Sequence, residues 1–399
     1  MVDYSFTEEQ DLFRESLKEF CAREIAPRTE LLERSKEMPE EIVKALANFE
    51  LLGMTVDPEY GGLGGDAVTA GIAAEELAMA NPNCAVPVFY LVMNSWSHVL
   101  NKYGTEDAKQ EILTKSTKGE HFVGIASTES DMGSDLGSMK TKIRPEGDKY
   151  VVNGEKMYIS GIGEAQKYGG GHVTLARMSE DLGTRGMNLF FLPLKDTPGI
   201  TPTFIDELGR EGISFGGFNI ENVEIPKHYL IGEENKGFYI IHEGYELARG
   251  LIGLVCVGAA TKALQNGIAY IKERKAFGRP IGKYEGIQFK LAEHHVRIQA
   301  LRELSYKALW TYDQEAKGKA SRFDVSMSIA MAKSVASQWA FDAINDVMQW
   351  QGAFGYTMEC EDQKALRGVR SFTLAEGTVE IMKLIIAREL LGKEFLAYR

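Results

Sequence analysis

The sequence has few cysteines and lacks any run of positive charge. Its four cysteines, Cys21, Cys84, Cys256 and Cys360, lie far apart in 399 residues and form no Cys-x-x-Cys pair. This spacing is typical neither of a disulfide scaffold nor of a zinc site, and it indicates a reducing compartment. Lysine and arginine number 45 against 57 acidic residues, which gives a formal net charge of −12. We therefore expect no binding to nucleic acid or to an anionic membrane surface.

Targeting segments and long apolar runs are also lacking. The N-terminus carries acidic residues and no basic-then-apolar start, so we expect no secretory or mitochondrial leader and a mature protein that begins where the sequence does. The longest uncharged stretch, residues 77–101, contains two prolines and four asparagines. A membrane span of about 20 apolar residues does not carry such a set. These absences predict a cytoplasmic protein without membrane insertion.

Several catalytic signatures are missing. No Gly-x-Gly-x-x-Gly joins a predicted strand to a helix, which argues against a nicotinamide dinucleotide site. No Gly-x-Ser-x-Gly is present, which argues against a serine hydrolase. His294 and His295 are adjacent on a predicted helix and diverge by about 100°, so they cannot share one metal ion. We expect no metal site.

The chain does contain three stretches with different apolar spacing. Residues 1–120 have apolar side chains three to four apart, residues 121–232 contain short β-rich runs between turn residues, and amphipathic helical spacing returns over 233–399. This order predicts an α+β protein with an N-terminal all-α domain, a middle β domain and a C-terminal helical domain. Asn153-Gly154, between two β-rich runs, predicts a tight hairpin.

Three polar clusters could support chemistry. Residues 127–135 follow a predicted strand and offer hydroxyl and N–H groups, which suit a flavin edge or a phosphate and are equally typical of an Asx-rich loop. Residues 273–280 end a predicted helix with Arg274 and Arg279, which could hold a pyrophosphate or only stabilise the helix end. Residues 375–378 place a carboxylate beside a glycine at a predicted helix start. From the residues alone, a functional and a purely structural interpretation of each cluster stay open.

Taken together and in order, these clusters resemble the FAD-dependent acyl-CoA dehydrogenases over essentially the whole chain. The resemblance implies a middle β-barrel or sandwich domain, a C-terminal four-helix bundle, and a homotetramer whose subunits share FAD contacts. The matching segments are Pro58–Gly64, Thr128-Glu129 with Gly133–Asp135, Asn153–Ser160, Arg274–Gly278, Gln349 with Gly352 and Gly355-Tyr356, and Glu376–Thr378.

The resemblance also implies a role for each matching residue. Glu376 matches the catalytic base, because Ala248, at the position that supplies the base in some members, has no proton acceptor. FAD contacts within the subunit match Ser127, Thr128, Tyr158, Ile159, Ser160 and Thr378. FAD contacts from another subunit match Arg274, Phe277, Gln288, Gln349 and Gly352. Positions around the acyl-CoA match Ser134, Arg249, Pro87, Val88, Leu91, Ala375 and Gly377.

The implied reaction is α,β-dehydrogenation of an acyl-CoA thioester, with electrons passed to an electron-transfer flavoprotein. The α-proton is a weak acid, so the thioester carbonyl needs hydrogen bonds, which in the family come from the N–H of the glutamate and a ribityl hydroxyl of FAD. Burial makes the carboxylate a better base by raising its pKa. Two alternatives remain: a flavin oxidase or monooxygenase, and a non-catalytic flavoprotein on the same fold.

The sequence departs from the family pattern at several places, among them Ala353-Phe354, which replaces a glycine-polar pair. Ala375 stands where a tyrosine or another large residue is frequent, and with apolar Pro87, Val88 and Leu91 it predicts a wide pocket for branched, cyclic or aryl acyl groups. Gly368 replaces a common aspartate, a change for which the sequence offers no functional account. The segment between β-rich runs that contains Gly169–Gly171 is longer than usual, and we expect a loop at a strand entrance.

Overall fold

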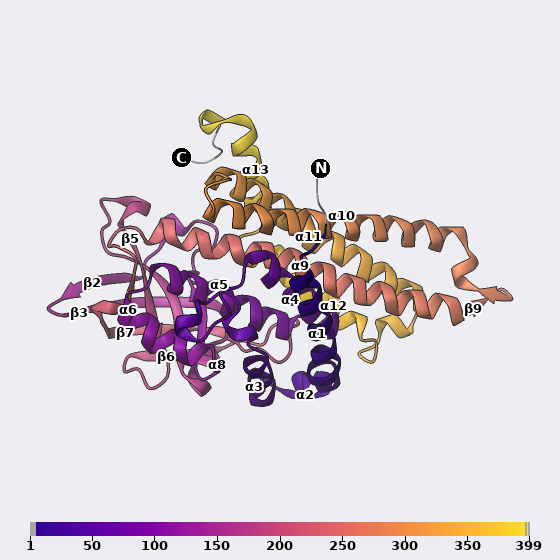
Figure 1. Cartoon of the computed structure of the whole chain (residues 1–399), viewed down its shortest axis with the longest axis horizontal. Helices are drawn as coiled ribbons and strands as arrows, with labels where there is room; N and C mark the ends of the chain where they lie inside the picture. Colours follow the sequence, from indigo (N-terminus) through magenta and orange to yellow (C-terminus); the bar gives the residue numbers. More distant parts are fainter. Residues whose placement is uncertain (1–4, 396, 398–399) are drawn as a thin grey trace.

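In the computed structural model, which describes residues 5–395 and 397, the first part of the chain is helical (Figure 1). The first helix begins at the capping box that joins Thr7 and Gln10, in which each side chain accepts a hydrogen bond from the other residue's backbone N–H. Helices α4 and α5 are buried on nearly every side, because α4 packs between α1 and the C-terminal helices, and α5 packs between the sheet and the C-terminal helices. The helices of this part are α1 Glu8–Phe20, α2 Thr29–Arg34, α3 Glu40–Asn48, α4 Ala67–Ala80, α5 Ala85–Tyr103, α6 Glu106–Ala108 and α7 Thr114–Ser116.

The middle of the chain forms an eight-stranded sheet. Its strand order is β6-β7-β3-β2-β4-β5-β8, and β1 pairs in parallel with β4. The end of β3 lies beside the polar segment that follows β1, since the Met157 N–H donates to the Thr128 carbonyl oxygen at 3.0 Å. The strands are β1 Phe122–Ala126, β2 Lys142–Glu146, β3 Lys149–Ser160, β4 Gly170–Arg177, β5 Met187–Pro193, β6 Ile200–Phe204, β7 Phe215–Pro226 and β8 Leu230–Ile231.

The hairpin predicted at Asn153-Gly154 is wrong. The turn between β2 and β3 lies at Gly147-Asp148, and β3 continues through Gly154 with a bulge opposite β7. Gly154 has φ +147°, and a Cβ there would lie 2.7 Å from the Cα of Thr141. The Asn-Gly pair therefore marks a bulge, because a bulge can use a glycine's positive φ as readily as a hairpin turn does.

The loop predicted between β3 and β4 is a helix, α8 Ile162–Tyr168. Its Glu164 is buried and accepts hydrogen bonds from the backbone N–H of Met38, at 2.7 Å, and of Ser214, at 3.1 Å. These two bonds satisfy a buried carboxylate, so α8 ties the β domain to the N-terminal part of the chain.

The C-terminal part is a helical bundle built around α9. This helix is long and apolar enough to cross a membrane, but 89% of its most apolar 18-residue window is buried within the protein, as for a core helix. Figure 1 shows α9 running between the N-terminal helices and the other bundle helices. The elements are α9 Gly237–Glu273, β9 Lys275–Ala276, β10 Arg279–Pro280, α10 Glu285–Ala316, α11 Arg322–Trp350, α12 Asp362–Arg370 and α13 Val379–Leu391.

Candidate active site

A cavity of about 750 Å³ lies where the sheet, α5, α9 and the segment before α13 meet. It collects most of the residues that the sequence predicted for one subunit's site. Segments separated by more than 200 residues in the sequence thus line the same cavity. The predicted residues that line it are Val88, Leu91, Ser127, Thr128, Ser134, Tyr158, Ile159, Ser160, Arg249, Ala375, Glu376, Gly377 and Thr378.

Glu376 lies in a left-handed turn at the entrance to α13. Its φ is +56° and that of Gly377 is +87°, and the Thr378 side chain then caps α13 by accepting from the N–H of Ile381. The Arg249 Nε donates to the Glu376 carbonyl oxygen at 2.6 Å. A Cβ on residue 377 would lie 3.2 Å from the Arg249 Nη2, so glycine allows this close approach. The turn is thereby held from α9.

The carboxylate of Glu376 is suited to accept a proton near neutral pH. Its Oε2 is buried and has no hydrogen-bond partner among the residues that the structure describes. Burial raises the pKa of Glu376 to about 7, against the opposing effect of the positive charges of Arg249 and Lys333. A general base works best when its pKa lies near the operating pH. The site therefore has the property expected of a catalytic base.

Opposite segments of the cavity wall offer hydroxyl and backbone groups. Ser127 and Thr128 directly follow β1, and the Tyr245 hydroxyl donates to the Ser127 Oγ at 2.6 Å. Tyr158 has φ +61° beside a β3 bulge and leaves 57% of its surface exposed. Ser160 ends the same strand. This open, polar wall fits a flavin ring, which needs hydrogen bonds at one edge and a flat contact surface.

A buried ion pair supports this wall from behind. The Lys156 Nζ lies 3.2 Å from the Glu129 Oε1 and donates to the Ser127 carbonyl at 3.3 Å. Glu129 also accepts from the backbone N–H of Lys140 and of Thr141, each at 2.8 Å. Burial lowers the pKa of Lys156 to about 8. Lys156 was not among the predicted site residues, although a lysine beside the apolar residues of a strand is itself a signal.

Six predicted residues do not line the cavity. Pro87 lies in buried α5 without reaching it. Four of the five residues predicted to act from another subunit are exposed at or just after the C-terminal ends of α9 and α11, and Gln288 is exposed in the first turn of α10. These two helix ends adjoin, since the Tyr270 hydroxyl donates to the Gln351 carbonyl at 3.3 Å. The structure thus gathers the five on one surface away from their own chain's cavity: Arg274, Phe277, Gln288, Gln349 and Gly352.

Several residues that line the cavity were not predicted from the sequence. His242, Tyr245 and Ile252 line the cavity with Arg249, and their spacing of three, four and three residues places them on one face of α9. That spacing was available in the sequence.

Gly368 now has a structural explanation, because a Cβ there would lie 2.4 Å from the Asn83 carbonyl oxygen.

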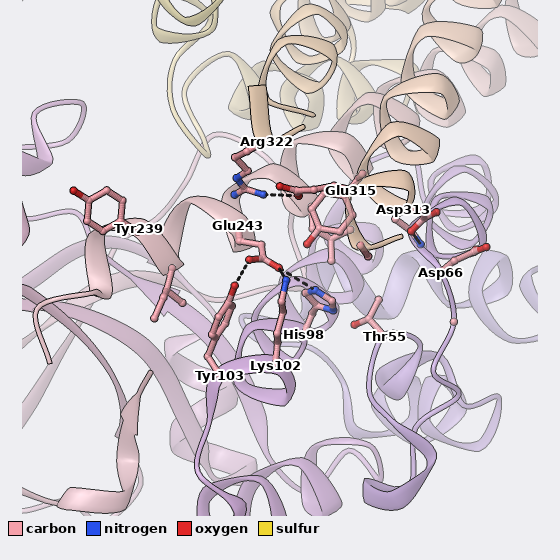
Figure 2. Close-up of a pocket in the computed structure, with 16 residues that line it drawn as sticks. Thr55, Asp66, His98, Lys102, Tyr103, Tyr239, Glu243, Asp313, Glu315 and Arg322 are labelled. Carbon is pink, nitrogen blue, oxygen red and sulfur yellow. Dashed lines mark hydrogen bonds and ion pairs between the residues drawn. The ribbon is translucent and has the colours of Figure 1, made fainter. Parts of the chain in front are cut away.

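A second cavity, of about 670 Å³, lies between α5, α9 and the junction of α10 with α11. Figure 2 shows Lys102 and Tyr103 directed at Glu243, with Arg322 beside Glu315. The Tyr103 hydroxyl donates to Glu243, and Arg322 lies 3.1 Å from Glu315. Charges of opposite sign therefore satisfy one another here, which makes this cluster a link between the helical domains.

Glu243 should stabilise the fold in a pH-dependent way. Although burial acts to raise the pKa of Glu243, its contacts with His98, Lys102 and Tyr103 lower this pKa to about 2. Because this lies below the unfolded value of about 4.3, the stabilisation is present above pH 4.3 and disappears as pH falls toward 2. Glu243→Gln should lower the free energy of unfolding by about 2 kcal/mol at pH 7.

Urea unfolding at pH 7 and pH 3 would measure this effect, with the exposed Glu359→Gln as the matched control. The difference between Glu243→Gln and the parent should shrink at pH 3. An equal difference at both pH values would show that charge is not the cause.

Comparisons with known proteins agree with this architecture. Family models for the N-terminal, middle and C-terminal domains of acyl-CoA dehydrogenases match residues 7–120, 124–223 and 235–391. A probable acyl-CoA dehydrogenase of Bacillus subtilis is 34% identical over 98% of this chain and 100% of its own. A 3-(aryl)acrylate reductase of Clostridium sporogenes is 30% identical over 97% of this chain and 99% of its own. The butyryl-CoA dehydrogenase of Megasphaera elsdenii matches with a TM-score of 0.89 and 27% identity, over 98% and 100% of the two chains.

The chain places a β domain between two helical domains, and a buried carboxylate and a polar wall line one cavity between them. The chain belongs to the acyl-CoA dehydrogenase family. Members of this family are FAD-dependent oxidoreductases, and the fold class predicted from the sequence is confirmed.

Proposed function

We propose that this protein removes the α-proton of an acyl-CoA thioester with Glu376 and passes the β-hydride to FAD. The observation that carries the proposal is the buried Glu376 oxygen without a hydrogen-bond partner among the described residues, in the same cavity as the polar wall. FAD, when bound, supplies the hydride acceptor. Ser127, Thr128 and Ser160 would hold its ring edge.

The chain's own residues would manage the proton and the developing negative charge. The Cα–H bond breaks, its proton moves to a carboxylate oxygen of Glu376, and the electron pair forms the new double bond as the β-hydrogen leaves as hydride. A backbone N–H of the Glu376 turn would polarise the thioester carbonyl where enolate charge develops. Ser134 and Arg249 would position the thioester end of the coenzyme.

The substrate class that we propose is a bulky, uncharged acyl group. Val88 and Leu91 line the cavity from α5, and Ala375 precedes the base. A pocket wall of this kind binds apolar surface and favours a group wide enough to fill it. The name of the Clostridium sporogenes relative, 3-(aryl)acrylate reductase, supports an aryl-bearing acid or thioester as one member of that class.

We further propose a cytoplasmic homotetramer with three domains, at 1–120, 121–232 and 233–399, that delivers electrons to an electron-transfer flavoprotein. The surface with the five remaining predicted FAD contacts supports shared sites, and Phe277 and Tyr356 on it are 97% and 94% exposed. Apolar side chains exposed to this degree favour an interface. Light scattering that shows a stable, FAD-loaded monomer would overturn the shared-site proposal.

Arg274 should matter more for FAD retention than Arg279 does. Arg279 lies over the ring of Tyr284 at 4.2 Å, whereas only Arg274 matches the FAD position. Loss of one charged hydrogen bond to a phosphate should weaken FAD binding roughly 10- to 100-fold in Arg274→Ala. The flavin-to-protein ratio after gel filtration measures this, and Arg279→Ala is the matched control. Equal FAD retention in the two variants would count against Arg274.

Anaerobic bleaching of the flavin tests the function itself. Straight, branched, cyclic and aryl-substituted acyl-CoA thioesters are added to the FAD-loaded protein, and absorbance loss at the flavin band is followed. We expect bleaching that is fastest with a bulky thioester. Absence of bleaching across the panel would overturn the proposal, and rapid oxygen consumption without an added acceptor would indicate an oxidase.

A further inference from the structure

Lys333 is a buried lysine in the middle of α11. It has no exposed surface, and its Nζ donates a hydrogen bond to the Gly377 carbonyl oxygen. An ammonium group removed from water is costly unless it is paired, so its position calls for an explanation. The function proposed above does not use it.

Arg249 makes the equivalent contact from another helix. Its Nε donates to the Glu376 carbonyl at 2.6 Å, while Lys333 reaches the next carbonyl along the chain. Two cations from α9 and α11 thus hold two successive peptide groups. Glu376 and Gly377, whose carbonyl groups accept these bonds, have φ values of +56° and +87°. A left-handed glutamate persists only where surrounding contacts impose it.

We propose that Lys333 is a positioning residue for the base: together with Arg249 it holds the Glu376-Gly377 turn in its left-handed form and keeps the carboxylate ionised for proton abstraction. This inference rests on the proposed function, since it assigns Lys333 to the same reaction. Hydrogen bonds to charged donors are shorter and stronger than neutral ones, which suits an anchor of strained backbone.

The charged groups around the turn make the electrostatic part testable. Arg249 and Lys333 act directly on Glu376, and burial is the opposing influence that raises its pKa. Burial lowers the pKa of Lys333 to about 7, with Arg249 acting in the same direction and Glu376, Cys256 and Glu380 opposing it.

The other titratable groups that act on Arg249 lie on α9 and α11. Tyr245 and Glu246 on α9 act on Arg249, as does Arg322 on α11. None of them replaces the charge that Lys333 brings to the turn. Removing that charge should therefore raise the pKa of Glu376 further, because the ionised carboxylate loses a stabilising partner.

The experiment compares Lys333→Met, Lys333→Gln and Lys333→Arg with the parent as FAD-loaded proteins. Exchange of the α-hydrogen of a bound acyl-CoA with deuterated solvent is followed by NMR between pH 5 and 9. In Lys333→Met and Lys333→Gln the acid limb of the profile should move up by about one pH unit, and Lys333→Arg should restore the parent position. The plateau rate should fall in Lys333→Met by about tenfold as the turn loosens.

Lys383→Met, which removes an exposed lysine on α13, is the control and should leave the profile unchanged. FAD content and the flavin spectrum verify that each variant is folded, and glutamine serves if methionine prevents folding. A parent-like acid limb in the folded variants would overturn the proposal even if the rate fell. If Glu376→Gln loses exchange while the Lys333 variants keep the parent acid limb, only the role of Lys333 is rejected. Exchange at the parent rate in Glu376→Gln would reject the proposed function.

Discussion

Replacing Glu376 by glutamine is expected to lower the rate of α-proton abstraction by at least roughly 10²- to 10⁴-fold, the usual contribution of a general base. The amide has nearly the same shape as the carboxylate, so the fold and FAD binding should persist. It cannot accept the proton, and no other described carboxylate lines the cavity beside the base except Glu207, which pairs with Arg210. Exchange of the α-hydrogen with deuterated solvent measures the effect without electron transfer.

Glu359→Gln is the matched control, because Glu359 is exposed and does not line the cavity. It should exchange at the parent rate. If Glu376→Gln did so too, another base would exist, and Glu246 and Glu129 would be tested next. Both are engaged in the structure: Glu246 lies 2.6 Å from Arg322, and Glu129 pairs with Lys156.

Ala375→Tyr is expected to reduce kcat/KM for bulky acyl-CoA thioesters at least about tenfold more than for butyryl-CoA. The tyrosine ring would occupy the space beside the base that a branched, cyclic or aryl group needs. A wide acyl group recovers about 25 cal/mol per Å² of buried apolar surface in that space, whereas a thin chain leaves part of it empty. Steady-state kinetics with paired thioesters measure the ratio.

The exposed Ala22 offers a control, since Ala22→Tyr adds the same ring away from the cavity. It should change both substrates little. If the parent prefers straight chains and Ala375→Tyr affects both classes alike, the protein itself fills the space next to Ala375. The proposal of a wide pocket would then be wrong, while the role of Glu376 would be unaffected.

Features that depend on neighbouring residues could be predicted from the sequence. The capping box at Thr7 and Gln10 and the helix start after Thr378 are local hydrogen-bond patterns, so a few letters suffice to define them. The change from helical to strand spacing near residue 121 is likewise local. The hairpin predicted at Asn153-Gly154 was wrong because the pair specifies only a backbone conformation, which a bulge and a turn both use.

The sequence by itself determined the order of helical, β and helical segments and, through the family motifs, which residue we propose as the base. Only the tertiary structure decided how the base is held. The bonds from Arg249 and Lys333 join residues 127 and 44 positions apart, and no local spacing encodes such pairs. The raised pKa of Glu376 also arises from tertiary packing, because burial between the helices and the sheet removes water from a carboxylate that would be ordinary in an isolated peptide.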